Sequence, residues 1–306
     1  MSHPREILPG ATYLITRRAL RRHMLFRPDA AITQLIIYTL AVSAKRFGIQ
    51  VHALCAMSTH VHLVVTDSAG VLPSFLQYFH RLVALGTKVI RAWEGAVWDH
   101  EATSVVRLLT RAAIVEKMAY VLANPVNAGL VKAAHEWPGA SVPLSEIGHG
   151  VLRAVRPAAY FNPRNLQWPA EVELPVPLPP TVEAGKAQDF LRDLRDELER
   201  HERRAADEIR AANTTTRGAE QACEVSPYGR VSTPEPIRDC SPSVATGRQH
   251  GEVRSLALRA VRVFRGAYRA ALELWRTGLR DAVFPLGTWW MRTFHGATVG
   301  GAMLAP

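Results

Sequence analysis

The chain has 306 residues, of which 48% are hydrophobic and 21% are charged, and its formal net charge is +10 at pH 7. This length allows one or two domains with a true hydrophobic core, and the composition excludes a wholly disordered protein. The excess of positive charge favours a polyanionic partner, with nucleic acid ahead of a membrane. The charge alone does not exclude the alternative, which is an arginine-rich protein that has no polyanionic partner.

The cysteines and the apolar stretches indicate where the protein works. Cys55, Cys223 and Cys240 are odd in number and far apart, with no C-x-x-C pair, which indicates reduced thiols and no zinc knuckle. The most apolar stretch, residues 30–44, is too short to span a bilayer. The first residues have no signal-peptide pattern. We therefore expect a cytoplasmic, nucleoid-associated protein.

The first 150 residues alternate between strand and helix patterns. Asp29 is expected to cap the first helix and Gly48 to end it, and Thr110 is expected to cap the last. The order strand–helix–strand–strand–helix–strand–helix is that of a ferredoxin-like α+β fold, an antiparallel sheet with helices on one face. The expected strands are 11–18, 49–57, 59–66 and 104–108, and the expected helices are 30–47, 72–93 and the one after Thr110.

The third strand carries two histidines. His60 and His62 alternate with apolar residues, so both lie on one face of the strand, about 7 Å apart along it. Two imidazoles at this spacing can share a metal ion. Taken alone, such a pair is more often packed or solvated than metal-bound. His52, on the preceding strand, is expected to be a core histidine.

A tyrosine and an asparagine follow on the last helix of this unit. Tyr120 and Asn124 are four residues apart, so both point to the same side of the helix, and Pro125 is expected to stop the helix just beyond them. If that side faces the histidines, two imidazole nitrogens, one amide oxygen and one phenol converge. Such a mixed nitrogen and oxygen site suits Mg²⁺ or Mn²⁺ better than structural zinc. The alternative for Tyr120 is a buried core tyrosine.

The strand with His60 and His62, followed by a helix with Tyr120 and the Asn124-Pro125 stop, resembles the HUH single-tyrosine transposases. These are insertion-sequence enzymes and their REP-associated tyrosine transposase relatives, which cut and rejoin single-stranded DNA. The resemblance covers roughly residues 8–142. One departure is that members usually have Pro-Asn before the first histidine, where this chain has Ser58-Thr59.

The resemblance implies a catalytic domain over residues 1–150. In it Tyr120 would be the nucleophile that forms a 5′-phosphotyrosine, and His60, His62 and Asn124 would bind Mg²⁺ or Mn²⁺. The partner would be single-stranded or hairpin DNA, with a homodimer left open and no nucleotide cofactor. The alternative is a domesticated, non-transposing protein that binds hairpin DNA and keeps the fold. A metal-dependent phosphoesterase for small substrates is disfavoured by the charge and the long basic tail.

The remainder of the chain divides into three segments by composition. Residues 151–185 are interpreted as a proline-rich linker, and residues 186–250 as a charged helix followed by a low-complexity polar segment. Residues 251–306 are expected to form a basic, mostly helical region, whose ending resembles the tail of longer members of the same family.

Several basic and aromatic residues are candidates for DNA contact, because arginines and lysines bind phosphates and aromatic rings stack on bases. For the arginines and the lysine the alternative is a solvated charged surface, and for the tryptophans it is a small helical core. The candidates are Arg17, Arg18, Arg21, Arg22, Arg81, Lys88, Arg262, Arg265, Arg269, Trp289 and Trp290.

Overall fold

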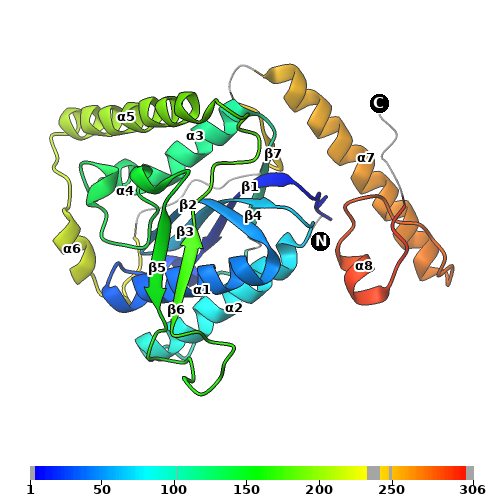
Figure 1. Cartoon of the computed structure of the whole chain (residues 1–306), viewed down its shortest axis with the longest axis horizontal. Helices are drawn as coiled ribbons and strands as arrows, with labels where there is room; N and C mark the ends of the chain where they lie inside the picture. Colours follow the sequence, from blue (N-terminus) through cyan, green and yellow to red (C-terminus); the bar gives the residue numbers. More distant parts are fainter. Residues whose placement is uncertain (1–3, 102, 233–241, 248–249, 301–306) are drawn as a thin grey trace.

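The computed structural model describes residues 4–101, 103–232, 242–247 and 250–300, which form two sheets with helices around the larger one (Figure 1). The strands are β1 (Ala11–Arg18), β2 (Ile49–Met57), β3 (His60–Asp67), β4 (Ser104–Leu108), β5 (Val151–Val155), β6 (Glu171–Pro175) and β7 (Val244–Ala245). The α-helices are α1 (Ala30–Phe47), α2 (Leu72–Arg91), α3 (Arg111–Leu122), α4 (Asn124–Asn127), α5 (Ala187–Ala211), α6 (Ala219–Glu224), α7 (Gly251–Arg276) and α8 (Trp290–His295). Short 3-10 turns lie at Leu20–Arg22, Ala134–Glu136 and Leu144–Glu146.

The larger sheet has the strand order β2-β3-β1-β4-β7. The first four strands pair antiparallel, and their order confirms the ferredoxin-like α+β fold expected from the sequence. The fifth strand, β7, pairs parallel with β4 through Val244 and Ala245. Two residues are too few to give a periodic pattern, so the sequence does not predict β7.

The helices divide between the two faces of this sheet (Figure 1). Side chains alternate along β3, so His60 and His62 face the side of α3, whereas Asp67 faces the side of α1 and α2. The sequence analysis predicted the helices on one face: α1 and α2 share a face as predicted, whereas α3 lies on the opposite face. The first two helices pack closely, because a Cβ atom at Gly86 would lie only 2.4 Å from a methyl carbon of Leu35.

The helix ends follow from local hydrogen bonds. The Asp29 carboxylate accepts the Ile32 N–H at 3.1 Å, and the Thr110 hydroxyl accepts the Ala113 N–H at 3.1 Å, so both predicted N-caps are confirmed. Gly48 ends α1 with a left-handed φ of 65°, as the sequence predicts. These caps fix the connections between the helices and the sheet.

The segment expected to be a proline-rich linker forms a hairpin instead. Strands β5 and β6 pair antiparallel and pack on α1, and the Tyr38 hydroxyl donates to the Pro169 carbonyl at 2.9 Å. Phe161, Leu174 and Val176 in this segment are buried in the main core. The prolines dominate the composition, but the apolar residues between them bury enough surface to order the hairpin.

The charged helix expected after residue 186 is α5, which packs against α3. It buries Phe190, Leu194 and Leu198 and leaves most of its charged residues exposed. Within the polar segment that follows, the structure contains α6 and β7, so these parts are ordered. Residues 233–241 and 248–249 of that segment lie outside the described residues.

The basic C-terminal region forms a helical unit of its own. Ala271, Phe284, Met291 and Ala297 make a small second core between α7, α8 and the loop that joins them. This unit is joined to the main body by contacts of α7 with β7 and by a hydrogen bond from the Ile7 N–H to the Gly287 carbonyl. Among the described residues, no helix combines the length and the apolar character needed to cross a bilayer.

Candidate active site

The two histidines of β3 lie side by side on the face covered by α3. Their ring centroids are 4.6 Å apart, with the ring planes at 85°. Each Nδ1 has a hydroxyl partner: His62 Nδ1 is 2.8 Å from the Thr16 Oγ1, and His60 Nδ1 is 2.9 Å from the Thr59 Oγ1. When Nδ1 carries the proton and donates to the hydroxyl, the lone pair is on Nε2, the form in which imidazole binds a metal.

His62 has the clearest ligand character of the two. Its Nε2 is buried and has no hydrogen-bond partner. Burial lowers the pKa of His62 well below its ordinary value, and the charges of His60 and Arg18 lower it further, so the ring is neutral at pH 7. A buried nitrogen without a partner is costly and requires a reason. A cation bound at Nε2 would supply one.

Asn124 completes a set of donor atoms around the histidines. Its Oδ1 is 3.3 Å from the His60 Nε2, and its side chain is buried. The predicted helix break occurs, although slightly earlier than expected: α3 ends at Leu122 and Asn124 begins α4. Pro125 explains the position of the break, because its ring would clash with the carbonyl four residues back, whereas proline suits a first helical turn.

Tyr120 lies in the last turn of α3, and its ring centroid is 5.4 Å from that of His62. The ring is half-buried and packs against the main core, and its remaining surface is exposed. The phenol, the two imidazoles and the amide are therefore brought together on one face of the sheet. The described residues contain no group of three or more His, Cys, Asp or Glu side chains that could hold a metal, and this site has two such side chains with the Asn124 amide beside them.

The turn before His60 is well held despite its departure from Pro-Asn. The Ser58 carbonyl accepts the Phe26 N–H at 3.0 Å, and the Thr59 carbonyl accepts the Ala19 N–H at 2.7 Å. The sequence analysis missed the two threonines that contact the histidines. Thr16 is directly opposite His62 in the β1–β3 register, so strand pairing was the signal that could have found it.

The arginines that follow β1 differ in their placement. Arg18 is opposite His60 in the register and shares the histidine face. Arg17 points to the other face, where its guanidinium donates to the Asp99 carbonyl at 3.0 Å and to the Glu101 carbonyl. Arg21 and Arg22 lie in the turn after the strand, at the same end of the sheet as His60. Only Arg18 of these four is beside the histidines.

The basic candidates on α2 are on the side of the sheet away from the histidines. Arg81 is exposed in the middle of the helix. Lys88 is near its C-terminus, with Nζ 3.4 Å from the Glu94 carbonyl. Neither is brought to the histidine face. His52 is a core histidine as expected: its Nδ1 donates to the Pro177 carbonyl, its Nε2 accepts from the Thr66 hydroxyl, and burial lowers its pKa to about 4.

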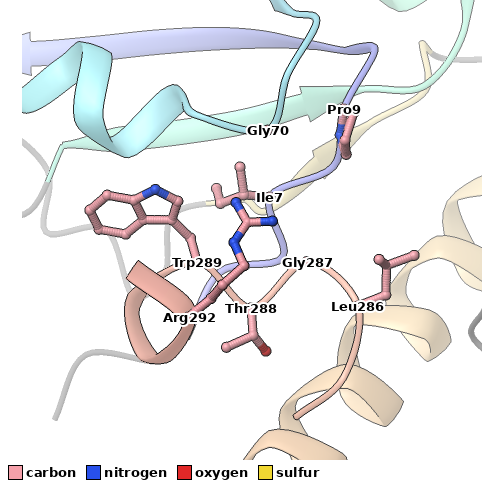
Figure 2. A pocket seen from close by; sticks show the side chains of 8 residues that line it. All are labelled: Ile7, Pro9, Gly70, Leu286, Gly287, Thr288, Trp289 and Arg292. Atoms are coloured by element: carbon pink, nitrogen blue, oxygen red, sulfur yellow. The ribbon is translucent and has the colours of Figure 1, made fainter. Parts of the chain in front are cut away.

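The remaining candidates belong to the C-terminal helical unit. Arg262 and Arg269 are exposed on α7, and Arg265 is half-buried. Trp289 packs against the main core, and Figure 2 shows it with Arg292 at a small pocket next to the N-terminal segment. Trp290 is 55% exposed. The core alternative therefore fits Trp289 and does not fit Trp290.

Several solved structures are similar to this chain, and two of them are transposases. No family model and no curated protein match the chain. A REP-associated tyrosine transposase bound to a REP hairpin is 16% identical over 48% of this chain and 84% of that one, with a TM-score of 0.41. A putative transposase from Deinococcus radiodurans is 19% identical over 36% of this chain and 87% of that one, with a TM-score of 0.28.

Proposed function

We propose that the protein is a metal-dependent single-stranded DNA transposase that cleaves and rejoins hairpin-flanked DNA through Tyr120. The observation that carries the proposal is the convergence of the Tyr120 ring, the His60 and His62 imidazoles and the Asn124 amide on one face of the sheet. The net charge of +10 supports a nucleic-acid substrate. In this reading the partner is single-stranded or hairpin DNA.

The residues present fit a divalent cation. The Nε2 atoms of His60 and His62 and the Oδ1 of Asn124 would hold Mg²⁺ or Mn²⁺, since the donors are nitrogen and oxygen and no thiolate is among them. When bound, the ion would neutralise negative charge on the scissile phosphate. Thr16 and Thr59 orient the imidazoles by holding their Nδ1 atoms.

The Tyr120 hydroxyl acts as the nucleophile in the proposed reaction. Its oxygen attacks the phosphorus and loses its proton, while the bond from phosphorus to the 3′ oxygen breaks and the leaving strand ends in a 3′-hydroxyl. The product is a 5′-phosphotyrosine. A second 3′-hydroxyl then attacks this phosphorus, reseals the strand and frees the phenol. Arg18, beside His60, is positioned to pair with a neighbouring phosphate.

The test is a search for the covalent intermediate. We expect wild-type protein incubated with single-stranded hairpin DNA and Mn²⁺ to give an adduct on a denaturing gel, and Tyr120→Phe to give none. The same gel without metal serves as the control. An adduct that survives in Tyr120→Phe would refute the assignment.

The second candidate is a hairpin-binding protein that keeps the fold and has lost strand transfer. The Ser58-Thr59 turn, which departs from the family's Pro-Asn, is the observation that favours it. Tight hairpin binding without any adduct, and with affinity unchanged in His60→Ala, would identify this function.

A further inference from the structure

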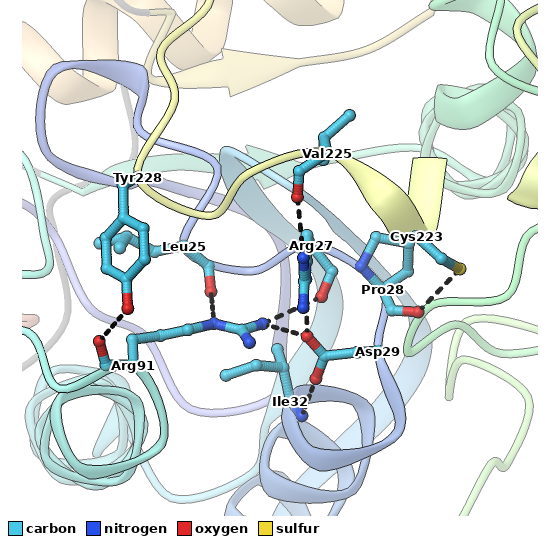
Figure 3. Close-up of polar contacts among 9 residues, drawn as sticks. All are labelled: Leu25, Arg27, Pro28, Asp29, Ile32, Arg91, Cys223, Val225 and Tyr228. Carbon is cyan, nitrogen blue, oxygen red and sulfur yellow. Dashed lines mark hydrogen bonds and ion pairs between the residues drawn. The ribbon is translucent and has the colours of Figure 1, made fainter. Parts of the chain in front are cut away.

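Residues 217–231, which we call the strap, run along the edge of the first 150 residues. The strap begins beside α4, where the Arg217 N–H donates to the Gly129 carbonyl, and it ends where the Val231 N–H donates to the Arg22 carbonyl at 3.3 Å. Figure 3 shows its middle part, in which Cys223, Val225 and Tyr228 contact the residues around Asp29 and Arg91. The strap therefore connects the α4 side of the site to the turn after β1.

The strap adds an aromatic ring to two others at the surface. The rings of Tyr228 and Trp93 are nearly parallel, with centroids 6.3 Å apart, and the His23 ring meets Trp93 edge-on at 4.9 Å. The Tyr228 hydroxyl donates to the Arg91 carbonyl at 2.7 Å, which fixes the orientation of the ring. Tyr228 is nevertheless 53% exposed. A fixed, exposed ring at the end of a stack is a surface on which another flat group can stack.

Basic residues border these rings. Arg21 and Arg22 have φ values of 47° and 57°, a left-handed conformation that costs energy for any residue except glycine. Arg230 of the strap is exposed, and its backbone forms an isolated antiparallel β-bridge with that of His23. The acidic neighbours are Glu94, next to Trp93, and Asp99, whose carboxylate accepts the Arg21 N–H at 3.0 Å. The strap holds Arg22 in this strained backbone conformation through the Val231 N–H, and strained residues of this kind are concentrated at functional sites.

We propose that these rings and arginines, which we call the ledge (His23, Trp93, Tyr228, Arg21, Arg22 and Arg230), bind an unpaired segment of single-stranded DNA. One base stacks on the exposed ring of Tyr228, and the arginines pair with the adjoining phosphates. Only unpaired bases can present a face to the rings, so a duplex does not fit. The ledge rests on the proposed function and deepens it: Arg18 is opposite His60, and Arg21 and Arg22 follow at the same end of the sheet, so a strand bound at the site would extend to the ledge around this end.

The test measures DNA affinity in EDTA, so that it depends neither on a metal nor on Tyr120. Fluorescence anisotropy of the full-length protein would be recorded with a labelled oligothymidine of about 20 nucleotides and with a duplex of the same length. Tyr228→Ala is expected to weaken oligothymidine binding by at least about fivefold, the lower range for stacking of one base on an aromatic ring. Tyr228→Phe keeps the ring and loses only the hydrogen bond to the Arg91 carbonyl, so it should lose much less affinity than Tyr228→Ala.

Arg21→Gly separates binding from stability. Glycine relieves the left-handed backbone, so this variant should be at least as stable as wild type. It should still bind oligothymidine more weakly, with a salt dependence reduced by about 0.7 in the slope of log K against log salt concentration. Tyr160→Ala, which removes an exposed tyrosine on the β5–β6 hairpin, is the matched control and should change nothing.

Three results would each overturn the ledge. These are oligothymidine binding that is no tighter than duplex binding, wild-type affinity in Tyr228→Ala, and equal losses in Tyr228→Ala and Tyr228→Phe. The proposed transposase activity is judged separately by the adduct on Tyr120. A chain with no adduct that loses oligothymidine affinity in Tyr228→Ala would keep the ledge and lose the transposase function.

Discussion

The main body and the C-terminal helical unit are built from similar proportions of apolar residues but pack them very differently. The sheet and its helices share one large continuous core, whereas α7, α8 and their loop share a core of four buried residues. Ten of the fifteen large exposed hydrophobic residues of the described chain lie beyond residue 250. The histidines and Tyr120 therefore rest on a rigid support, while the C-terminal unit adds little to it.

The largest expected effect comes from removing one fully buried phenylalanine from each core. Phe79→Ala, under the sheet, should cost about 3–5 kcal/mol of unfolding free energy and abolish the adduct by unfolding the main body. Phe284→Ala empties the small core instead, and the adduct on Tyr120 should persist. Chemical denaturation and the adduct gel together check this. If Phe284→Ala abolished the adduct, the two regions would be one cooperative unit.

Loss of a proposed metal ligand should separate activity from stability within the main body. His60 is only partly buried, so His60→Ala should shift the melting temperature little while adduct formation falls by about 100-fold, as when a coordinating group is lost. Chelation of the metal by EDTA in wild type should have the same effect. The assignment fails if the activity of His60→Ala matches that of wild type in limiting Mn²⁺.

The ion pair at the start of α1 should contribute about 1–2 kcal/mol to the unfolding free energy of the main body. Asp29 caps α1 and pairs with the buried Arg91, so Asp29→Ala loses the cap and leaves a charge without its partner. Burial alone would raise the pKa of Asp29, but hydrogen bonds from Arg91, the Ile32 N–H and Arg27 outweigh it and lower the pKa below 3.8.

This shift fixes the pH dependence of the contribution. A carboxyl whose pKa is lower in the folded state stabilises the fold above its ordinary pKa, and the stabilisation is lost as the pH falls through the lowered value. Urea unfolding of wild type and Asp29→Ala at pH 7 and pH 3 should therefore give a smaller difference at pH 3. A difference that grew on acidification would contradict the ion pair.

The smallest expected effect concerns the exposed tryptophan of the C-terminal unit. Trp290→Ala should change the unfolding free energy by less than about 0.5 kcal/mol, because the side chain is mostly exposed. If this unit contacts DNA, the same variant should weaken hairpin binding about fivefold. Trp289→Phe is the control: Trp289 packs against the main core, so this variant should leave hairpin binding unchanged. If Trp290→Ala and wild type have the same hairpin affinity, Trp290 does not contact DNA.

The elements of the main body could be predicted because each has a local signal. Asp29, Gly48 and Thr110 mark helix ends through contacts within a few residues, and the alternation around His60 and His62 marks a strand. The sequence also predicted that Tyr120 and Asn124 share a side, which the structure bears out although the helix breaks between them.

The features that escaped prediction depend on contacts between distant residues. Thr16 reaches His62 only through the pairing of β1 with β3, and Tyr228 reaches Arg91 only because the strap returns to a residue 137 positions earlier in the sequence. The proline content of residues 151–185 led to the prediction of a linker, whereas β5 and β6 form there because their apolar residues pack against α1. No periodic pattern within one segment carries such information.

The parallel pairing of β7 with β4 has a consequence for dissecting the chain. The hairpin, α5, the strap and β7 all pack onto the first 150 residues, so a fragment ending at residue 150 would leave the outer surface of α3 and one edge of the sheet bare. Such a fragment would be prone to aggregate through that edge. Removal of the last two helices leaves this edge covered, so a minimal fragment for biochemistry should retain everything through Ala245.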